Sequence, residues 1–258
     1  MSDYETIIYE KQGGRATVML NRPDNLNGIT MQLLRELYEC LNRVADDRDV
    51  RAVLFTGAGK GFCPGADLKA FTSGESIETT PKEYFHVSTL LHEMPKVTVA
   101  GINGACAGAG LGWACACDLR YATARASFNT AFLGVAISGD MGGPWTLPKI
   151  LGAAKARELY FMPDKFKADE AERIGLVSKA FPDETFREDV DAIVDRLAKS
   201  APLALVDMKK NFVNAESMAL RDFIDLESER HVRTGASSDS KEAFKAFVEK
   251  REPNFEGK

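Results

Sequence analysis

The segment VTVAGINGACAGAGLGWACAC, residues 97–117, is the most informative part of this 258-residue chain. It runs for 21 residues without a charged side chain, a length at which a transmembrane helix has to be considered. However, it begins with the β-branched residues Val97-Thr98-Val99 and has glycines at positions 101, 104, 108, 110 and 112. These features favour a buried strand, a glycine turn and a closely packed helix, so we expect no membrane span.

Strands and helices are expected to alternate on both sides of this segment. The predicted strands are residues 4–10, 16–20, 51–56, 97–102 and 119–122. Gly13-Gly14 supplies the positive φ that a hairpin turn between the first two strands requires. Thr30 is expected to cap the next helix, and Thr80-Pro81-Lys82-Glu83 has the pattern of a capping box that opens a helix to about Met94. The alternation predicts the α/β fold class.

Beyond about Gly152 the pattern changes to a series of helices. They are predicted at residues 155–161, 168–174, 184–198, 202–213, 218–233 and 241–250. The last of them are amphipathic, with Phe223, Leu226, Phe244 and Phe247 on apolar stripes. Because these helices cannot bury their stripes alone, we expect them to dock on the core or on a second subunit.

Composition and charge exclude several classes of function. The chain has 33 basic and 38 acidic residues, a net charge of −5, so it lacks the basic surface of a non-specific nucleic-acid binder. Its five cysteines form no C-x-x-C pair and it has three histidines, so we expect no metal site and interpret the cysteines as buried thiols in a reducing cytosol. Residues 1–5 lack the features of a secretory signal, which predicts a cytoplasmic location.

Several catalytic motifs can also be set aside. The loop Gly57-Ala58-Gly59-Lys60-Gly61 is not a Walker A motif, because no Ser or Thr follows Lys60. The sequence has neither a G-x-G-x-x-G after a strand nor a G-x-S-x-G elbow. His86, His92 and His231 are widely separated, and we interpret them as surface or packing residues.

Two junctions between a loop and a helix are rich in small residues, namely 63-CPGADL-68 and 104-GACAGAG-110. A helix start presents unpaired N–H groups and partial positive charge, and small residues let a ligand oxygen approach closely. Either junction alone is equally consistent with close packing. Together they predict an oxyanion hole, because acyl chemistry needs paired donors at the developing charge.

At this point the chain resembles the crotonase (enoyl-CoA hydratase/isomerase) superfamily over nearly its whole length. The matching pieces are Leu20–Pro23 with Leu26-Asn27, residues 61–69, residues 102–118, Gly175–Val177, and residues 246–251 with Asn254-Phe255. The resemblance implies a spiral of β-β-α units in residues 1–195 that binds acyl-CoA, followed by a C-terminal α-helical trimerisation region in residues 196–258. It further implies an acyl-CoA thioester substrate, no cofactor beyond the coenzyme A of that substrate, and a homotrimer or hexamer.

The family's functional positions can be transferred residue by residue. Its two oxyanion donors correspond to the backbone N–H groups of Ala66 and Ala109. The segments that bind coenzyme A correspond to Asn25-Leu26 and to Ala66-Asp67-Leu68-Lys69. The two catalytic glutamates of a hydratase correspond to Gly112 and Phe132 here, which cannot transfer a proton.

An acid is found instead at Asp140, where isomerase branches of the family have a proton carrier. The surrounding sequence resembles the phenylacetate-pathway branch, so the resemblance implies an enoyl-CoA isomerase of acyl-CoA or fatty acid metabolism, with Asp140 as proton shuttle. An alternative role for Asp140 is to cap a helix before Met141-Gly142-Gly143, and the two roles are compatible.

Other functions remain open at this stage. Enoyl-CoA hydratase is one alternative, and a non-catalytic acyl-CoA-binding protein is another. Asp140 also aligns with the nucleophile of acyl-CoA dehalogenases and hydrolases, although the histidine and tryptophan of that branch are replaced by Phe85 and Phe132. We predict Phe85, Gly112 and Phe132 in the substrate pocket, with Phe71 and Trp145 as further aromatic candidates.

Overall fold

The computed structural model describes residues 4–73 and 80–258, except the side chain of Phe71. Its described strands form two sheets, one of six strands in the order β1-β2-β3-β5-β7-β10 and one of four in the order β4-β6-β8-β9. The strands are β1 (Ile7–Gln12), β2 (Arg15–Leu20), β3 (Ala52–Gly57), β4 (Gly61–Cys63), β5 (Val97–Ile102), β6 (Ala105–Ala107), β7 (Leu119–Thr123), β8 (Ser127–Asn129), β9 (Phe166–Lys167) and β10 (Lys179–Phe181). The predicted α/β class is confirmed.

Helices follow or separate these strands. The α-helices are α1 (Met31–Asp46), α2 (Leu68–Thr72), α3 (Val87–Glu93), α4 (Ala109–Ala116), α5 (Gly143–Leu151), α6 (Ala153–Phe161), α7 (Ala168–Arg173), α8 (Phe186–Ala198), α9 (Pro202–Ala215), α10 (Leu220–Gly235) and α11 (Ser238–Glu249). Short 3₁₀ helices are η1 (Pro23–Asn25), η3 (Lys82–His86) and η4 (Leu133–Val135).

The chain winds as a spiral of β-β-α units. In each unit the first strand joins the larger sheet and the second joins the smaller one, as in β3-β4, β5-β6 and β7-β8. The strands of successive units pair in parallel within each sheet, and α3, α4 and α5 follow the three units. The predicted spiral is therefore present, and the chain leaves β4, β6 and β8 toward the following helices from the smaller sheet.

The core lies on both faces of the larger sheet. Val53 and Phe55 of β3 pack in the main core, whereas Ala52 and Leu54 pack with residues of α8. This alternation follows from the two-residue period of a strand. On the main side, every residue of α4 is buried, as expected for a helix without a polar face.

The N-terminal hairpin and the cap of α1 match their predictions. β1 and β2 pair in antiparallel register from Ile7↔Leu20 to Gln12↔Arg15, and Gly13 has a φ of +55°. Gly14 is needed for a different reason, because a Cβ there would lie 2.7 Å from the carbonyl oxygen of Ala198. At the start of α1, the Thr30 hydroxyl accepts a hydrogen bond from the Leu33 N–H at 3.2 Å.

Three details differ from the sequence predictions. Residues 82–93 form η3 and α3 instead of one helix, and Thr80 makes no cap, since its hydroxyl lies 3.4 Å from the Met31 sulfur. Strands do not end near Gly152, because β9 and β10 pair with β8 and β7. The helix α5, whose nine residues include Pro144 and Pro148, is not among the predicted helices and enters the sequence analysis only through the possible cap at Asp140.

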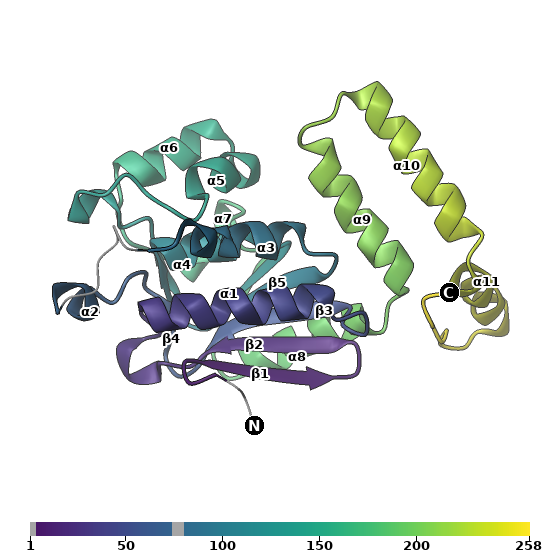
Figure 1. Cartoon of the computed structure of the whole chain (residues 1–258), viewed down its shortest axis with the longest axis horizontal. Coiled ribbons are helices and arrows are strands. Elements are labelled where there is room, and N and C mark those ends of the chain that lie inside the picture. The colour runs from purple at the N-terminus through teal and green to yellow at the C-terminus, as the bar shows by residue number, and fades with distance from the viewer. Residues whose placement is uncertain (1–3, 74–79) are drawn as a thin grey trace.

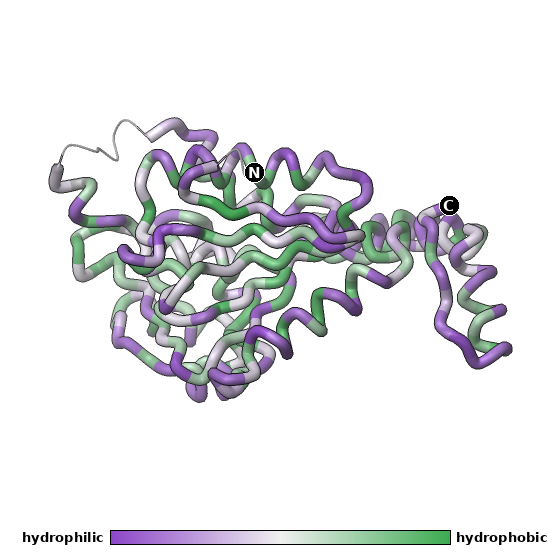
Figure 2. Tube along the Cα trace, turned by 90° about the horizontal axis from the view of Figure 1, so that it is seen from below, coloured by the Kyte–Doolittle hydropathy of each residue, from purple (hydrophilic) through white to green (hydrophobic). Residues whose placement is uncertain are grey.

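The C-terminal helices extend away from the body of the molecule. Figure 1 shows α9 and α10 side by side with α11 beyond them, and Figure 2 shows this arm from another direction, with hydrophobic residues along it. Several large apolar side chains on the arm are exposed: Phe212, Leu220, Val232, Phe244, Phe247 and Val248. In the described residues no helix has the length and hydropathy to cross a membrane, and the segment 97–117 forms β5, β6 and α4.

Candidate active site

The two small-residue junctions meet because their strands are neighbours. β4 pairs in parallel with β6, with Cys63 opposite Cys106, so the chain leaves both strands at the same edge. Gly65 and Gly108 have positive φ angles of 97° and 52°. A Cβ placed on Gly108 would lie 3.7 Å from the Cα of Gly65, so the two backbones approach closely.

Each junction has one backbone N–H group that can donate a hydrogen bond to a ligand. A parallel bridge joins Ile29 to Ala66, in which the Ile29 N–H donates to Gly65 and the Asp67 N–H donates to Ile29, both at 2.9 Å. Because neighbouring amides of an extended strand point to opposite sides, the Ala66 N–H is directed away from Ile29. Ala109 is the first residue of α4, where N–H groups have no partner within the helix. The geometry is that of two donors beside each other.

Both alanines line one cavity of about 590 Å³, which we call the inner cavity. Its lining residues come from α1 and its cap, the two junctions, η3 and the loop before α5: Ile29, Thr30, Met31, Leu34, Pro64, Gly65, Ala66, Leu68, Thr80, Phe85, Gly108, Ala109, Ala131, Phe132, Val135, Ile137, Gly139, Asp140 and Met141. Among these described lining residues, Asp140 alone has an ionisable side chain. The inner cavity therefore combines two backbone donors, one carboxyl group and apolar walls.

The Asp140 carboxyl group is poorly solvated. Its Oδ1 atom is buried and has no hydrogen-bond partner among the described residues. Burial raises the pKa of Asp140 to about 6, because a low-dielectric environment disfavours the charged form. A carboxyl group with this pKa can accept and return a proton near neutral pH.

The alternative role of Asp140 as a helix cap is wrong. The N-cap of α5 is Gly142, with a φ of +74°, and no side chain caps this helix. Asp140 takes part only through its backbone, since its carbonyl oxygen accepts from the Gly143 N–H at 3.4 Å. The side chain is therefore not used in holding α5.

Some of the predicted pocket residues line the inner cavity, and others do not. Phe85 and Phe132 line the inner cavity, and Phe132 stacks on Tyr160 with ring centroids 6.1 Å apart. Gly112 does not line it: this residue is buried in α4 beneath Met141, so its prediction as a pocket residue is corrected. Trp145 lies outside the inner cavity, packed edge-on against the ring of His92. The side chain of Phe71 lies outside the described part of the chain.

The residues predicted to contact coenzyme A form a rim beside Ala66. Asn25 ends η1 and Leu26 follows with a φ of +52°, while Leu68 and Lys69 are exposed at the start of α2. Asp67 caps α2 by accepting from the Lys69 and Ala70 N–H groups. Of the residues predicted to contact coenzyme A, Ala66 and Leu68 line the inner cavity.

Two residues that the sequence did not single out hold this rim. Arg22 donates to the Asp67 carboxylate at 2.9 Å and also to the Gly28 carbonyl. The Asn27 side chain is fully buried, accepts from the Arg22 N–H and donates to the carbonyls of Ala58 and Gly61. Both residues belong to the matching family segment, so that resemblance was a usable signal.

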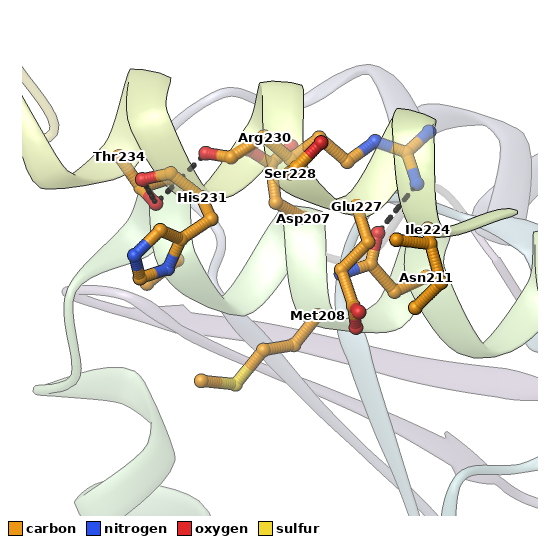
Figure 3. Close-up of a pocket in the computed structure, with 10 residues that line it drawn as sticks. Asp207, Met208, Asn211, Ile224, Glu227, Ser228, Arg230, His231 and Thr234 are labelled. Carbon is orange, nitrogen blue, oxygen red and sulfur yellow. Dashed lines mark hydrogen bonds between the residues drawn. The ribbon is translucent and has the colours of Figure 1, made fainter.

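The remaining polar groups do not form a competing centre. All five cysteines are buried free thiols, and burial raises the pKa of Cys63 to about 12. Within the described residues, no group of three His, Cys, Asp or Glu side chains could hold a metal ion. Figure 3 shows another pocket, of about 420 Å³, between α9 and α10, where Arg230 donates to Asn211 at 2.7 Å. That pocket is on the projecting arm, at the opposite end of the molecule from α2 (Figure 1).

A spiral of β-β-α units whose two small-residue junctions meet at one apolar cavity is the arrangement of the crotonase class of proteins. Comparison with known sequences agrees: the model of the family described as enoyl-CoA hydratase/isomerase matches residues 10–258. This chain belongs to the enoyl-CoA hydratase/isomerase family, and so it is an acyl-CoA enzyme of that family.

Individual relatives differ in the reaction that they are named for. A probable enoyl-CoA hydratase of Rhodobacter capsulatus is 35% identical over 99% of both chains. The 1,2-epoxyphenylacetyl-CoA isomerase of Escherichia coli is 33% identical over 98% of this chain and 99% of its own. Among solved structures, the enoyl-CoA hydratase of Bacillus anthracis has a TM-score of 0.93 at 28% identity, covering 98% of this chain and 100% of its own.

Proposed function

We propose that this protein is an enoyl-CoA isomerase that moves a double bond with Asp140 as its proton shuttle. The Asp140 carboxylate removes a proton from C2 of a 3-enoyl-CoA, and the electron pair passes to the thioester oxygen. The N–H groups of Ala66 and Ala109 stabilise the resulting dienolate. Asp140 then returns the proton to C4, the carbonyl re-forms, and the product is the conjugated 2-enoyl-CoA.

The observation that supports this most directly is the presence of one carboxyl group and two available amides on the same cavity. A shift of a double bond needs one group that first accepts and then donates a proton, and a pKa of about 6 suits both steps. Hydration of a double bond needs a second acid–base group to activate water. At the corresponding positions this chain has Phe132, which is stacked on Tyr160, and Gly112, which is covered by Met141.

The walls of the inner cavity indicate the class of acyl group. Besides Asp140, its polar side chains are Thr30 and Thr80, and both hydroxyls already contact protein atoms. The other described side chains in the walls are apolar, with Phe85 and Phe132 among them. We therefore propose an apolar or aromatic acyl chain on coenzyme A, as in phenylacetate catabolism, with Asn25-Leu26 and Ala66–Lys69 binding the coenzyme.

The proposal is tested with two substrates and one variant. With a 3-enoyl-CoA we expect absorbance of the conjugated thioester to appear, and with a 2-enoyl-CoA we expect no comparable loss of it in water. The Asp140→Asn variant should lose isomerisation but still bind a saturated acyl-CoA. Isomerisation at the wild-type rate by this variant, or rapid hydration by the wild type, would refute the proposal.

We also propose that the protein works as a homotrimer or hexamer in the cytoplasm, with no cofactor besides the substrate's coenzyme A. The exposed apolar side chains of the arm, among them Phe247 at 86% exposure, support an association of subunits. The five free thiols are consistent with a reducing compartment. Light scattering on the purified protein tests the assembly, and a monomeric mass at micromolar concentration would contradict it.

A further inference from the structure

A second cavity shares Asp140 with the inner cavity, and we call it the outer cavity. Its volume is about 500 Å³, and it is lined by Phe85, Gly139, Asp140 and Met141, all of which also line the inner cavity. Its remaining described lining residues are His86, Ser88, Thr89, Gly142 and Pro144. Residues 139–141, the segment that holds the carboxyl group, therefore line both cavities.

The two cavities differ in their side chains. The inner cavity is apolar apart from Asp140 and two threonines. In the outer cavity, the His86 Nδ1 lies 3.1 Å from the Thr89 hydroxyl, and the Ser88 hydroxyl donates to the Met141 carbonyl at 2.8 Å. His86 is exposed to solvent, and the space beside Gly142 is open, with no heavy atom within 4 Å of a Cβ built there. These features suit water molecules better than an acyl chain.

A bound substrate makes this difference important. When an acyl group fills the inner cavity, it excludes water from that side of Asp140. The Oδ1 atom has no protein partner among the described residues, so no protein group there takes up its proton. The outer cavity, which Asp140 also lines, is not occupied by that acyl group and can still hold water.

We propose that the outer cavity is the route by which the Asp140 carboxyl group exchanges its proton with solvent during turnover, with His86 and Thr89 at its mouth. This rests on the proposed isomerase function. After Asp140 has taken the proton from C2, a water chain in the outer cavity replaces that proton with one from solvent. The proton delivered to C4 then comes from water in some turnovers and from C2 in the others.

The experiment is isomerisation of a 3-enoyl-CoA in D₂O, with the deuterium at C4 of the product measured by mass spectrometry and NMR at low conversion. The wild type should place deuterium at C4. Thr89→Trp fills the outer cavity, and His86→Gln replaces the imidazole at its mouth without adding bulk. Each variant should lower that deuterium content several-fold. Both variants should retain most of the wild-type turnover, because neither residue lines the inner cavity.

Matched substitutions far from the site serve as controls. Thr185→Trp on the exposed residue before α8 and His231→Gln in the pocket of the arm should leave the deuterium content unchanged. If Thr89→Trp is unstable, His86→Gln alone still tests the route. Isomerisation with no deuterium at C4, or with the same content in both outer-cavity variants as in the wild type, would overturn this inference alone. A wild-type protein that does not isomerise would remove the proposed function and this inference with it.

Discussion

Met141 occupies the space that any side chain at residue 112 would need. A Cβ built on Gly112 would lie 2.8 Å from the Cβ of Met141 and 2.9 Å from its carbonyl oxygen. Met141 itself has a φ of +50°, and its carbonyl accepts from the Ser88 hydroxyl, so this backbone has little freedom to move. The residue next to Asp140 thus fills the position at which a hydratase has its first glutamate.

The first prediction concerns this contact. Gly112→Ala should lower the free energy of unfolding by about 1–3 kcal/mol, because the added methyl group meets backbone atoms instead of a flexible side-chain end. It should also reduce isomerisation, because Met141 can make room for the added methyl group only by a backbone shift that also moves the adjacent Asp140. Gly235→Ala is the matched control, because no heavy atom lies within 4 Å of a Cβ there. Equal urea midpoints for the two variants would show that the contact is not restrictive.

The second prediction is a pH profile. Because the base must be ionised in the free enzyme, kcat/KM for isomerisation should rise with pH and level off above a midpoint near pH 6, the pKa to which burial raises Asp140. A normal aspartate would give a midpoint near pH 4. Steady-state rates from pH 4.5 to 8 measure this, provided that circular dichroism shows the fold intact throughout. A flat profile over that range would exclude Asp140 as the base.

The third prediction concerns the direction in which the free energy of unfolding changes with pH. Since the pKa of Asp140 is higher in the folded chain than the ordinary value of 3.8, the folded state binds the proton more tightly, and its stability falls as pH rises from about 4 to about 6. Asp140→Asn removes this penalty. The variant should therefore be more stable than the wild type at pH 7, by on the order of 2 kcal/mol, and about equal to it below pH 4. A lower unfolding temperature for the variant at pH 7 would contradict burial of the charge.

Much of this arrangement could be predicted from the sequence, because its determinants are local. The hairpin, the Thr30 cap and most C-terminal helices follow from patterns within ten or twenty residues. The two junctions were found as small-residue segments before helices, and the resemblance then related Ala66, Ala109 and Asp140 to one another. The proximity of Ala66 and Ala109 in the structure depends on the parallel pairing of β4 and β6. Each of these strands has three residues, too few for a sequence pattern that would predict a strand.

What the sequence could not show depends on contacts between distant segments. The Thr80 capping box failed because the Thr80 hydroxyl contacts Met31, 49 residues away, instead of the helix that follows it. Gly112 is predicted in the pocket because it corresponds to a catalytic position of the family. That correspondence carries no information about the loop containing Met141, which covers Gly112 in this protein. Asp140 was considered as a helix cap because Asp is a good N-cap residue, whereas the positive φ of Gly142 made a glycine the cap of α5.

The fourth prediction concerns the turn before α4. Gly108 has φ and ψ angles of 52° and −125°, a region that residues with a Cβ rarely adopt. Gly108→Ala should therefore shift the start of α4 and misalign the Ala109 N–H, which we expect to lower kcat about 10²-fold. The KM for substrate should change less, because the proposed coenzyme-binding residues are Asn25-Leu26 and Ala66–Lys69. If Gly108→Ala instead raised KM and left kcat nearly unchanged, Gly108 would act in substrate binding.

The last prediction tests how the arm is attached to the catalytic body. Lys209 of α9 is buried, and its ammonium group lies 2.9 Å from the Asp118 carboxylate and donates to the carbonyls of Leu91 and Lys96 at 3.0 and 2.8 Å. These groups belong to α3, the bend before β5 and the segment between α4 and β7, so one side chain joins α9 to three parts of the spiral. Lys209→Met should leave a partly buried carboxylate and two carbonyls without this donor, and should lower the free energy of unfolding by about 3 kcal/mol. Its neighbour Lys210 is exposed, so Lys210→Met should change stability by less than about 0.5 kcal/mol.

Because Lys209 is remote from the inner cavity, the folded Lys209→Met protein should keep the wild-type pH midpoint for isomerisation. A shifted midpoint would show that the arm is coupled to Asp140.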